Sequence, residues 1–141
     1  MPLLKKNSYG TISVSDKVMM TGILAAIERS GLTGDVWLAT KRGKFLAEDR
    51  FFSNAEMRNA IAAEFDENER IRLSFCVIVR FGVPISQTVD TLCSVLAQLI
   101  EERMGRMPAL IKVTVTGMKS SKTDKIARRN MELEIPYGPE E

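Results

Sequence analysis

The chain has 141 residues, which is the length of one ordinary domain. Its 45% hydrophobic and 27% charged residues exclude a wholly disordered or fibrous protein. The net charge of +2 is too small to indicate nucleic-acid or membrane binding by itself. Histidine is absent, which excludes Ser-His and Cys-His nucleophiles and removes the commonest metal ligand.

The remaining motifs predict no catalytic residue, no cofactor and no metal site. Cys76 and Cys93 lie in separate apolar segments, so they form neither a CxxC pair nor a zinc ligand set, and we expect buried thiols. No apolar run reaches the roughly 20 residues that span a bilayer, and the first residues lack the apolar stretch of a signal peptide. We therefore expect no direct membrane span and a cytoplasmic location.

The first predicted elements are a strand and a helix. Residues 10–14 alternate apolar and small polar positions, which is typical of a half-buried strand. Apolar residues then recur at helical spacing over 16–30, with Ser15 as the predicted N-cap and Gly31 as the residue that closes the helix. Because this helix is amphipathic, its apolar face must pack on another element.

A hairpin and a short helix are predicted next. Two apolar segments, 36–40 and 45–46, flank a basic turn that contains a glycine. Residues 53–56 then form a capping box, and Ala60 and Ile61 lie on one side of the short helix that it predicts through about Phe65.

The clearest strand spans 71–81, where every second residue is apolar. The alternate face carries Cys76 and Ile78 at its centre, so we expect that stretch to be covered on both sides. Ser86 is the predicted cap of a long amphipathic helix over 86–104, and an alternating strand follows over 111–116. A helical crossover of this length permits parallel pairing of the two strands.

The segment from Met118 to Asn130 is strongly basic, with five basic residues against one acidic residue. Residues 131–135 then alternate like a short edge strand. At helical spacing Lys122, Lys125, Arg128 and Arg129 would share one face. We expect the basic residues to bind a partner. We also expect that deletion of residues 119–141 leaves the fold intact. A solvated tail is the alternative. The candidate partner-binding residues are Lys119, Lys122, Lys125, Arg128 and Arg129.

Three further groups of residues are candidate binding sites. Gly31–Gly34 has the G-x-x-G form of a KH nucleic-acid clamp, but its two central residues are not basic and a strand is predicted after it, so a helix cap and turn is the favoured interpretation. An acidic group over 64–69 lacks the alternation and glycine of a calcium loop, so it predicts a solvated loop. The predicted hairpin tip carries a candidate anion-binding group of three basic residues, Lys41, Arg42 and Lys44. Exposure of these charges to solvent is the alternative explanation.

Two stretches carry glycines and apolar residues in a recognisable order. The first runs through Gly10, Ile12, Val14, Ser15, Val18 and Gly31. The second comprises Val79, Arg80, Phe81, Gly82, Val83, Pro84 and Ile85, then Met104, Gly105, Val113, Val115 and Gly117. Together they resemble the bacterial alkaline-shock family, the envelope stress response proteins of Gram-positive bacteria. Residues 36–65 and the basic tail depart from the family pattern.

The resemblance implies a non-enzymatic protein-interaction or scaffold function in cell-envelope homeostasis or stress response. It implies a cytoplasmic location, or one at the inner face of the cell membrane through a membrane-embedded protein partner. Because glycines and core apolar positions carry the match, it transfers no functional site. The alternative is a small RNA-binding module of KH-like shape.

The fold prediction is a single small α/β domain. A mixed sheet would contain the strands over 10–14, 71–81 and 111–116, and the two main amphipathic helices would pack on it. An open sheet edge would also permit a homo-oligomer. The predicted divisions are an N-terminal lead over 1–8, the alkaline-shock-type domain over 9–117 and the basic tail over 118–141.

Overall fold

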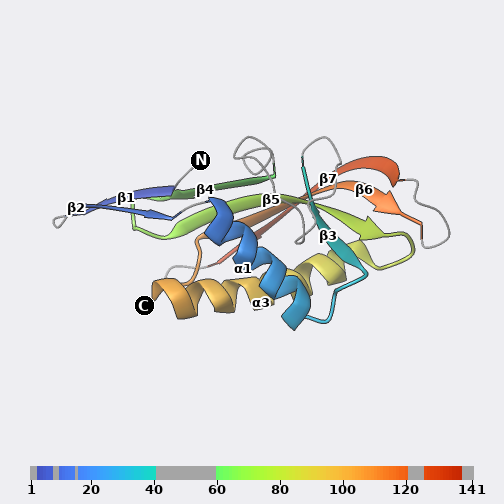
Figure 1. Cartoon of the computed structure of the whole chain (residues 1–141), viewed down its shortest axis with the longest axis horizontal. Coiled ribbons are helices and arrows are strands. Elements are labelled where there is room, and N and C mark those ends of the chain that lie inside the picture. Colours follow the sequence, from blue (N-terminus) through green and yellow to red (C-terminus); the bar gives the residue numbers. More distant parts are fainter. Residues whose placement is uncertain (1–2, 8–9, 15, 41–59, 121–125, 138–141) are drawn as a thin grey trace.

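Among the described residues, five strands form a mixed sheet, and two helices cover one of its faces (Figure 1). This small α/β domain confirms the predicted fold class. The computed structural model describes residues 3–7, 10–14, 16–40, 60–120 and 126–137. The elements are β1 (Leu3–Asn7), β2 (Gly10–Val14), α1 (Asp16–Arg29), β3 (Val36–Ala39), β4 (Ile61–Phe65), β5 (Ile71–Arg80), α3 (Ile85–Met104), β6 (Leu110–Lys119) and β7 (Ile126–Pro136).

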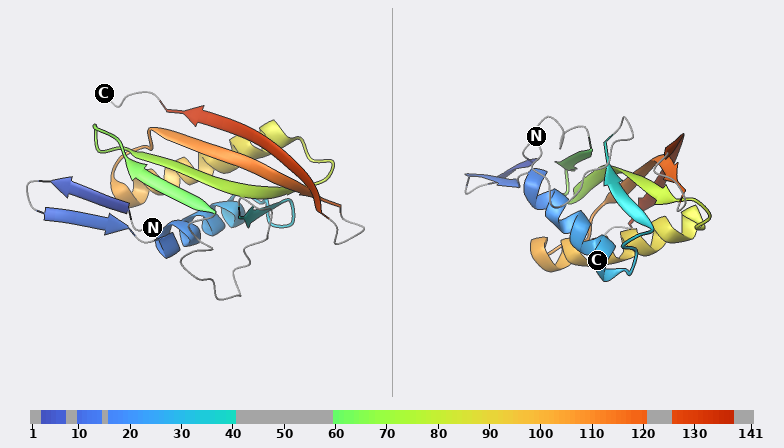
Figure 2. Two further views of the ribbon diagram at one scale, coloured as in Figure 1. Left: turned by 90° about the horizontal axis from the view of Figure 1, so that it is seen from above. Right: turned by 45° about the vertical axis from the view of Figure 1, so that its right-hand side comes forward.

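Strand β5 is the central strand of this sheet (Figure 2). On one side it pairs in parallel with β6, as predicted for strands joined through a helix. On the other side β4 pairs with its first half and β3 with its second half, both antiparallel. Strand β7 lies antiparallel to β6 and completes the order.

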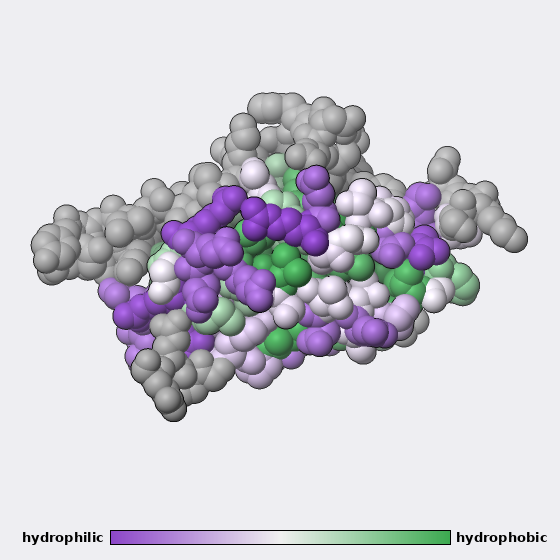
Figure 3. Space-filling model, turned by 90° about the horizontal axis from the view of Figure 1, so that it is seen from below, coloured by the Kyte–Doolittle hydropathy of each residue, from purple (hydrophilic) through white to green (hydrophobic). Residues whose placement is uncertain are grey.

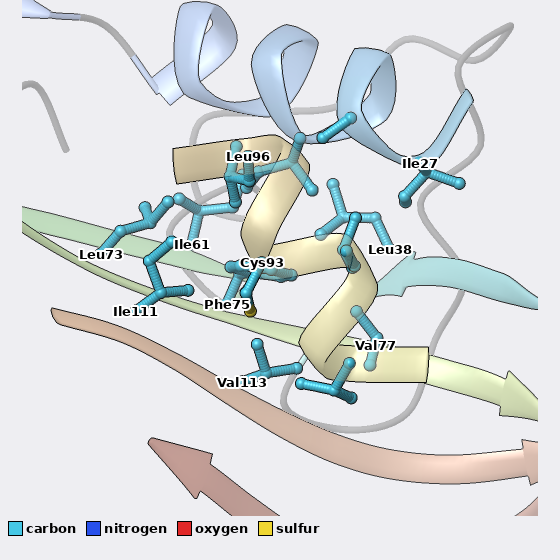
Figure 4. Close-up of a cluster of buried hydrophobic side chains, with 14 of the residues drawn as sticks. Ile27, Leu38, Ile61, Leu73, Phe75, Val77, Cys93, Leu96, Ile111 and Val113 are labelled. Atoms are coloured by element: carbon cyan, nitrogen blue, oxygen red, sulfur yellow. The ribbon is translucent and has the colours of Figure 1, made fainter. Parts of the chain in front are cut away.

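The hydrophobic core lies between the sheet and the two helices (Figure 4). Alternate residues of β5, such as Phe75 and Val77, point towards the helices, where they meet Leu96 of α3. Ile27 of α1 reaches the same layer. Two amphipathic helices therefore bury their apolar faces against one face of the sheet.

The centre of β5 is also buried on the opposite face, as predicted. Cys76 is 5% exposed, and Ile78 is completely buried. Trp37 of β3 pairs with Ile78 in the register, and the Lys119 ammonium lies 5.6 Å from the centroid of the Trp37 ring. This cation–π contact crosses β5 from β3 to β6, beside Ile78.

The end of α1 follows the prediction. Gly31 adopts a positive φ of 77°. The Gly31 N–H donates to Glu28 O at 3.1 Å, and the Leu32 N–H donates to Ile27 O at 3.0 Å. This pair of bonds is a Schellman motif, which satisfies two of the last helical carbonyls. Ser15, the predicted N-cap, lies outside the described residues.

The start of α3 differs from the prediction. The N-cap is Pro84, and no side chain caps the helix, so the assignment of this role to Ser86 is wrong. The Thr88 N–H donates to Pro84 O at 2.9 Å, which places Ser86 inside the first turn. The fixed φ of proline suits it to a helix start, so the helix begins before the serine.

Two other predicted elements are corrected. Residues 10–14 form a strand, but β2 pairs with β1 in a separate two-stranded sheet instead of joining the main one. Residues 61–65 are strand β4, so the predicted helix through Phe65 is wrong there. Ile61 and Phe65 find partners along β5, and this pairing outweighs the local helical spacing. The second arm of the predicted hairpin and the capping box lie outside the described residues.

A buried arginine joins three parts of the chain. Arg70 is 7% exposed and stands just before β5. Its guanidinium donates to Met107 O at 3.2 Å, to Pro108 O at 2.7 Å and to Tyr137 O at 3.3 Å. The start of β5, the segment after α3 and the residue after β7 are therefore held together by one side chain.

Arg70→Met should lower the free energy of unfolding by about 3 kcal/mol, because it removes a charged donor from three carbonyls in one buried and two partly buried hydrogen bonds. Arg72→Met is the matched control. Arg72 is exposed, and a surface change of this kind stays within about 0.5 kcal/mol. Urea denaturation of both variants measures the difference, and equal midpoints would contradict this role of Arg70.

Gly22 within α1 and Gly31 just after it should respond oppositely to alanine. Gly22 is inside the helix, and a Cβ added there meets no atom within 4 Å, so Gly22→Ala should stabilise the fold by about 0.5–1 kcal/mol. A Cβ added at Gly31 meets no atom within 4 Å either, but the positive φ of this residue is strained for alanine. Gly31→Ala should therefore lower the free energy of unfolding by about 1 kcal/mol. Urea denaturation tests both signs, and a change of the same sign in both would contradict the argument.

Candidate interaction surfaces

An apolar groove lies between the two helices. It has a volume of about 180 Å³. Hydrophobic residues appear among hydrophilic ones on this face of the molecule (Figure 3). The groove is lined by Met19 and Gly22 of α1 and by Leu96, Leu99, Ile100, Arg103 and Met104 of α3.

Gly22 opens this groove. The space in which its side chain would lie holds no atom within 4 Å, so no packing contact requires a glycine there. A glycine inside a helix is destabilising by roughly 0.5–1 kcal/mol relative to alanine. Leu96 and Ile100 line the groove on the α3 side, where they are 2% and 6% exposed.

The charged residues beside the groove belong mainly to the end of α3. Arg103 lines the groove and is exposed, and it has no ion-pair partner among the described residues. Arg29 and Glu102 form a loose pair at 3.9 Å in which both side chains are largely exposed. Such a pair contributes little to stability, so these charges are available to a partner.

The sheet face opposite the helices has a different character. Two shallow hollows of about 590 and 550 Å³ lie on it. Small residues such as Ala62 and Ser74 line both hollows, and Lys112 pairs with Glu132 at 3.3 Å. Glu64 and Arg72 are direct partners in the β4–β5 register. Charges of both signs alternate here, so this face lacks the single-sign field that favours nucleic acid.

A third surface lies at the end of the sheet where β5 leads into α3. Phe81 is 67% exposed, and the following residues to Ile85 carry no polar side chain. Arg80 Nε donates to Asp35 Oδ1 at 2.7 Å. The Phe81 N–H donates to Lys119 O at 2.8 Å, so the loop starts directly beside the end of β6.

The structure separates the predicted partner-binding residues. Lys119 ends β6, whereas Arg128 and Arg129 belong to β7. Because both arginines lie in a strand, the expected common helical face is wrong for these two residues. Lys122 and Lys125 lie outside the described residues, as do the candidate anion-binding residues Lys41, Arg42 and Lys44.

Residues beyond 117 include a full strand of the sheet. Strand β7 pairs with β6 from Lys119↔Ile126 to Leu110↔Pro136. The Tyr137 hydroxyl also donates to Cys93 O of α3 at 3.2 Å. Deleting residues 119–141 would remove this whole strand, so we now expect the deletion to disturb the fold, and the basic residues are better tested by substitution.

The other two candidate groups, Gly31–Gly34 and the acidic group over 64–69, have structural roles. Gly31–Gly34 joins α1 to β3, and its first two N–H groups cap α1, which confirms the cap-and-turn interpretation. Asp66 starts the turn between β4 and β5. Its Oδ1 accepts the N–H groups of Asn68 and Arg70, both at 2.9 Å. The acidic group is therefore a hairpin turn.

Cys93 is not a nucleophile in this environment. Both cysteines are buried free thiols, as predicted. Burial raises the pKa of Cys93 from 9.0 to about 12, and the nearby Asp90 adds to the shift. Burial raises the pKa of Tyr137 from 10.0 to about 12, with Cys93 and Asp90 as further causes. The Cys93 thiol therefore stays protonated near neutral pH, and a protonated thiol is a poor nucleophile.

Comparison with known proteins finds no match among protein-family models, curated sequences or solved structures. Within the described ranges, neither helix has both the length and the apolar character needed to cross a membrane.

Sequence reasoning missed the groove, the exposed loop and the role of Arg70. The apolar loop 81–85 is visible in the sequence, but the sequence does not show that Phe81 is exposed. The groove depends on how α1 crosses α3, and no local pattern contains that information. Arg70 gave no signal, because its acceptors are backbone carbonyls of distant segments.

The free energy of unfolding should fall as the pH rises from about 9 towards about 12. In this range the unfolded chain releases the protons of Cys93 and Tyr137, whereas the folded chain retains them. The double variant Cys93→Ala/Tyr137→Phe should lose stability less steeply with pH. Urea denaturation at several alkaline pH values measures the slope, and equal slopes in both proteins would refute the assignment.

Proposed function

We propose that this chain is a non-enzymatic protein-interaction module of alkaline-shock type that acts in cell-envelope homeostasis or stress response. It works in the cytoplasm or at the inner face of the cell membrane, and its partner is a protein. The groove between α1 and α3 is the observation that supports the proposal, because an apolar channel between two helices is a common docking site for a third helix.

The lining favours an amphipathic helix as the occupant. Met19 and Met104 are flexible side chains that adjust to a partner's shape. Gly22 allows the backbone of a partner helix to approach α1 closely. Arg103 would pair with a carboxylate next to the apolar face of that helix.

The RNA-binding alternative has weaker support. A KH clamp requires its G-x-x-G loop between two helices, whereas Gly31–Gly34 leads from a helix into a strand. The sheet face opposite the helices carries Glu64, Glu132 and Glu134 among its basic residues, and these carboxylates would repel phosphates.

Filling the groove should abolish partner binding while the fold is retained. Gly22→Phe places a ring in the groove, and Gln98→Phe adds the same ring to an exposed position of α3 that does not line it. Tagged proteins are recovered from gently solubilised native cells after cross-linking, and co-purifying proteins and nucleic acid are scored. We expect a defined set of proteins with wild type and Gln98→Phe, and its loss with Gly22→Phe.

Circular dichroism and urea denaturation confirm that both variants are folded. The proposal is wrong if Gly22→Phe recovers the same proteins as wild type. It is also wrong if the recovered material is RNA that dissociates steeply with added salt. Substrate turnover by the purified protein that one substitution abolishes would refute the non-enzymatic assignment.

A further inference from the structure

An exposed apolar loop connects β5 to α3. The sequence Phe-Gly-Val-Pro-Ile over 81–85 contains no polar side chain. Phe81, Gly82 and Pro84 are exposed, and Val83 and Ile85 are half-buried. Phe81 is the only exposed large hydrophobic residue in the described part of the chain. Exposed connections are normally polar, so an apolar one at the end of the molecule indicates a contact surface (Figure 1).

Basic residues border this loop on the sheet side. The Phe81 N–H bonds to Lys119 O, and the Lys119 ammonium lies over the Trp37 ring. Arg80 precedes the loop, and its side chain remains 43% exposed although it pairs with Asp35. Arg128 of β7 stands opposite Gly117 in the register, close to the same end of the sheet.

We propose that this end of the molecule, formed by the 81–85 loop with Arg80 and Lys119, binds an anionic phospholipid surface. Phe81 would enter the interfacial region, where aromatic rings are favoured. The basic residues would attract the headgroups, and each contributes to binding while it lies near the surface.

A lipid surface fits this end better than a folded protein does. Protein hot spots pair an apolar anchor with a shaped pocket. No residue of 81–85 lines the groove or either hollow described above. An apolar tip beside cations suits a fluid surface that has no fixed shape and carries negative charge.

Vesicle co-sedimentation tests this inference with the full-length protein. One set of vesicles contains phosphatidylcholine alone, and the other contains phosphatidylcholine with phosphatidylglycerol. We expect binding only to the anionic set, and weaker binding as salt is added. Trp37 is the single tryptophan and lies beside Lys119, so its emission should change when anionic vesicles bind.

Variants separate the two contributions. Phe81→Ser should weaken binding about tenfold, because the loop loses the ring that would enter the interfacial region. Lys119→Glu should weaken it several-fold through the change of charge. Arg106→Glu makes the same charge change beyond the opposite end of α3 and should bind like wild type. Gly22→Phe should also bind like wild type, because the groove is a separate surface.

The inference is overturned if anionic vesicles fail to sediment the protein at low salt, or if Phe81→Ser binds like wild type. Equal losses in Arg106→Glu and Lys119→Glu would also overturn it, because binding would then follow net charge alone. Sedimentation that requires a reconstituted membrane protein would instead assign the loop to a protein contact. None of these outcomes depends on the groove.

Discussion

The burial of β5 on both faces is the constraint on which the rest of the structure depends. One face meets the core beneath α1 and α3, and the other buries Cys76 and Ile78. A strand buried in this way must also pair along both edges, since its N–H and C=O groups have no access to water. Strands β3 and β4 satisfy one edge and β6 satisfies the other, so β5 positions every strand of the main sheet except β7.

This constraint explains which predictions from the sequence succeeded. The strand over 71–81, the helix that follows and the strand over 111–116 each have strong periodicity, and they form the β5–α3–β6 unit. The G-x-x-G turn was also resolved correctly, because Gly31 acts through bonds within a few residues. In these places local chemistry and the global fold agree.

The failures occurred where distant pairing decides the structure. Residues 61–65 have apolar spacing compatible with a helix, yet the edge of β5 requires a partner there and converts them to a strand. Residues 126–136 were predicted as a tail with only a short strand, but β6 needs an antiparallel neighbour over its length. The groove and the exposed Phe81 depend on helix crossing and loop placement, which sequence periodicity does not encode.

Helix α3 connects the two proposed contact surfaces. Its N-terminus begins at the apolar loop, and the second half of the same helix lines the groove. Twenty residues of helix extend about 30 Å, and α3 is packed along the core, so the two surfaces are held at a fixed separation. A partner helix in the groove would then lie at a defined height above an anionic membrane that the loop contacts. A scaffold needs this property, because it must hold one component at a set position relative to another.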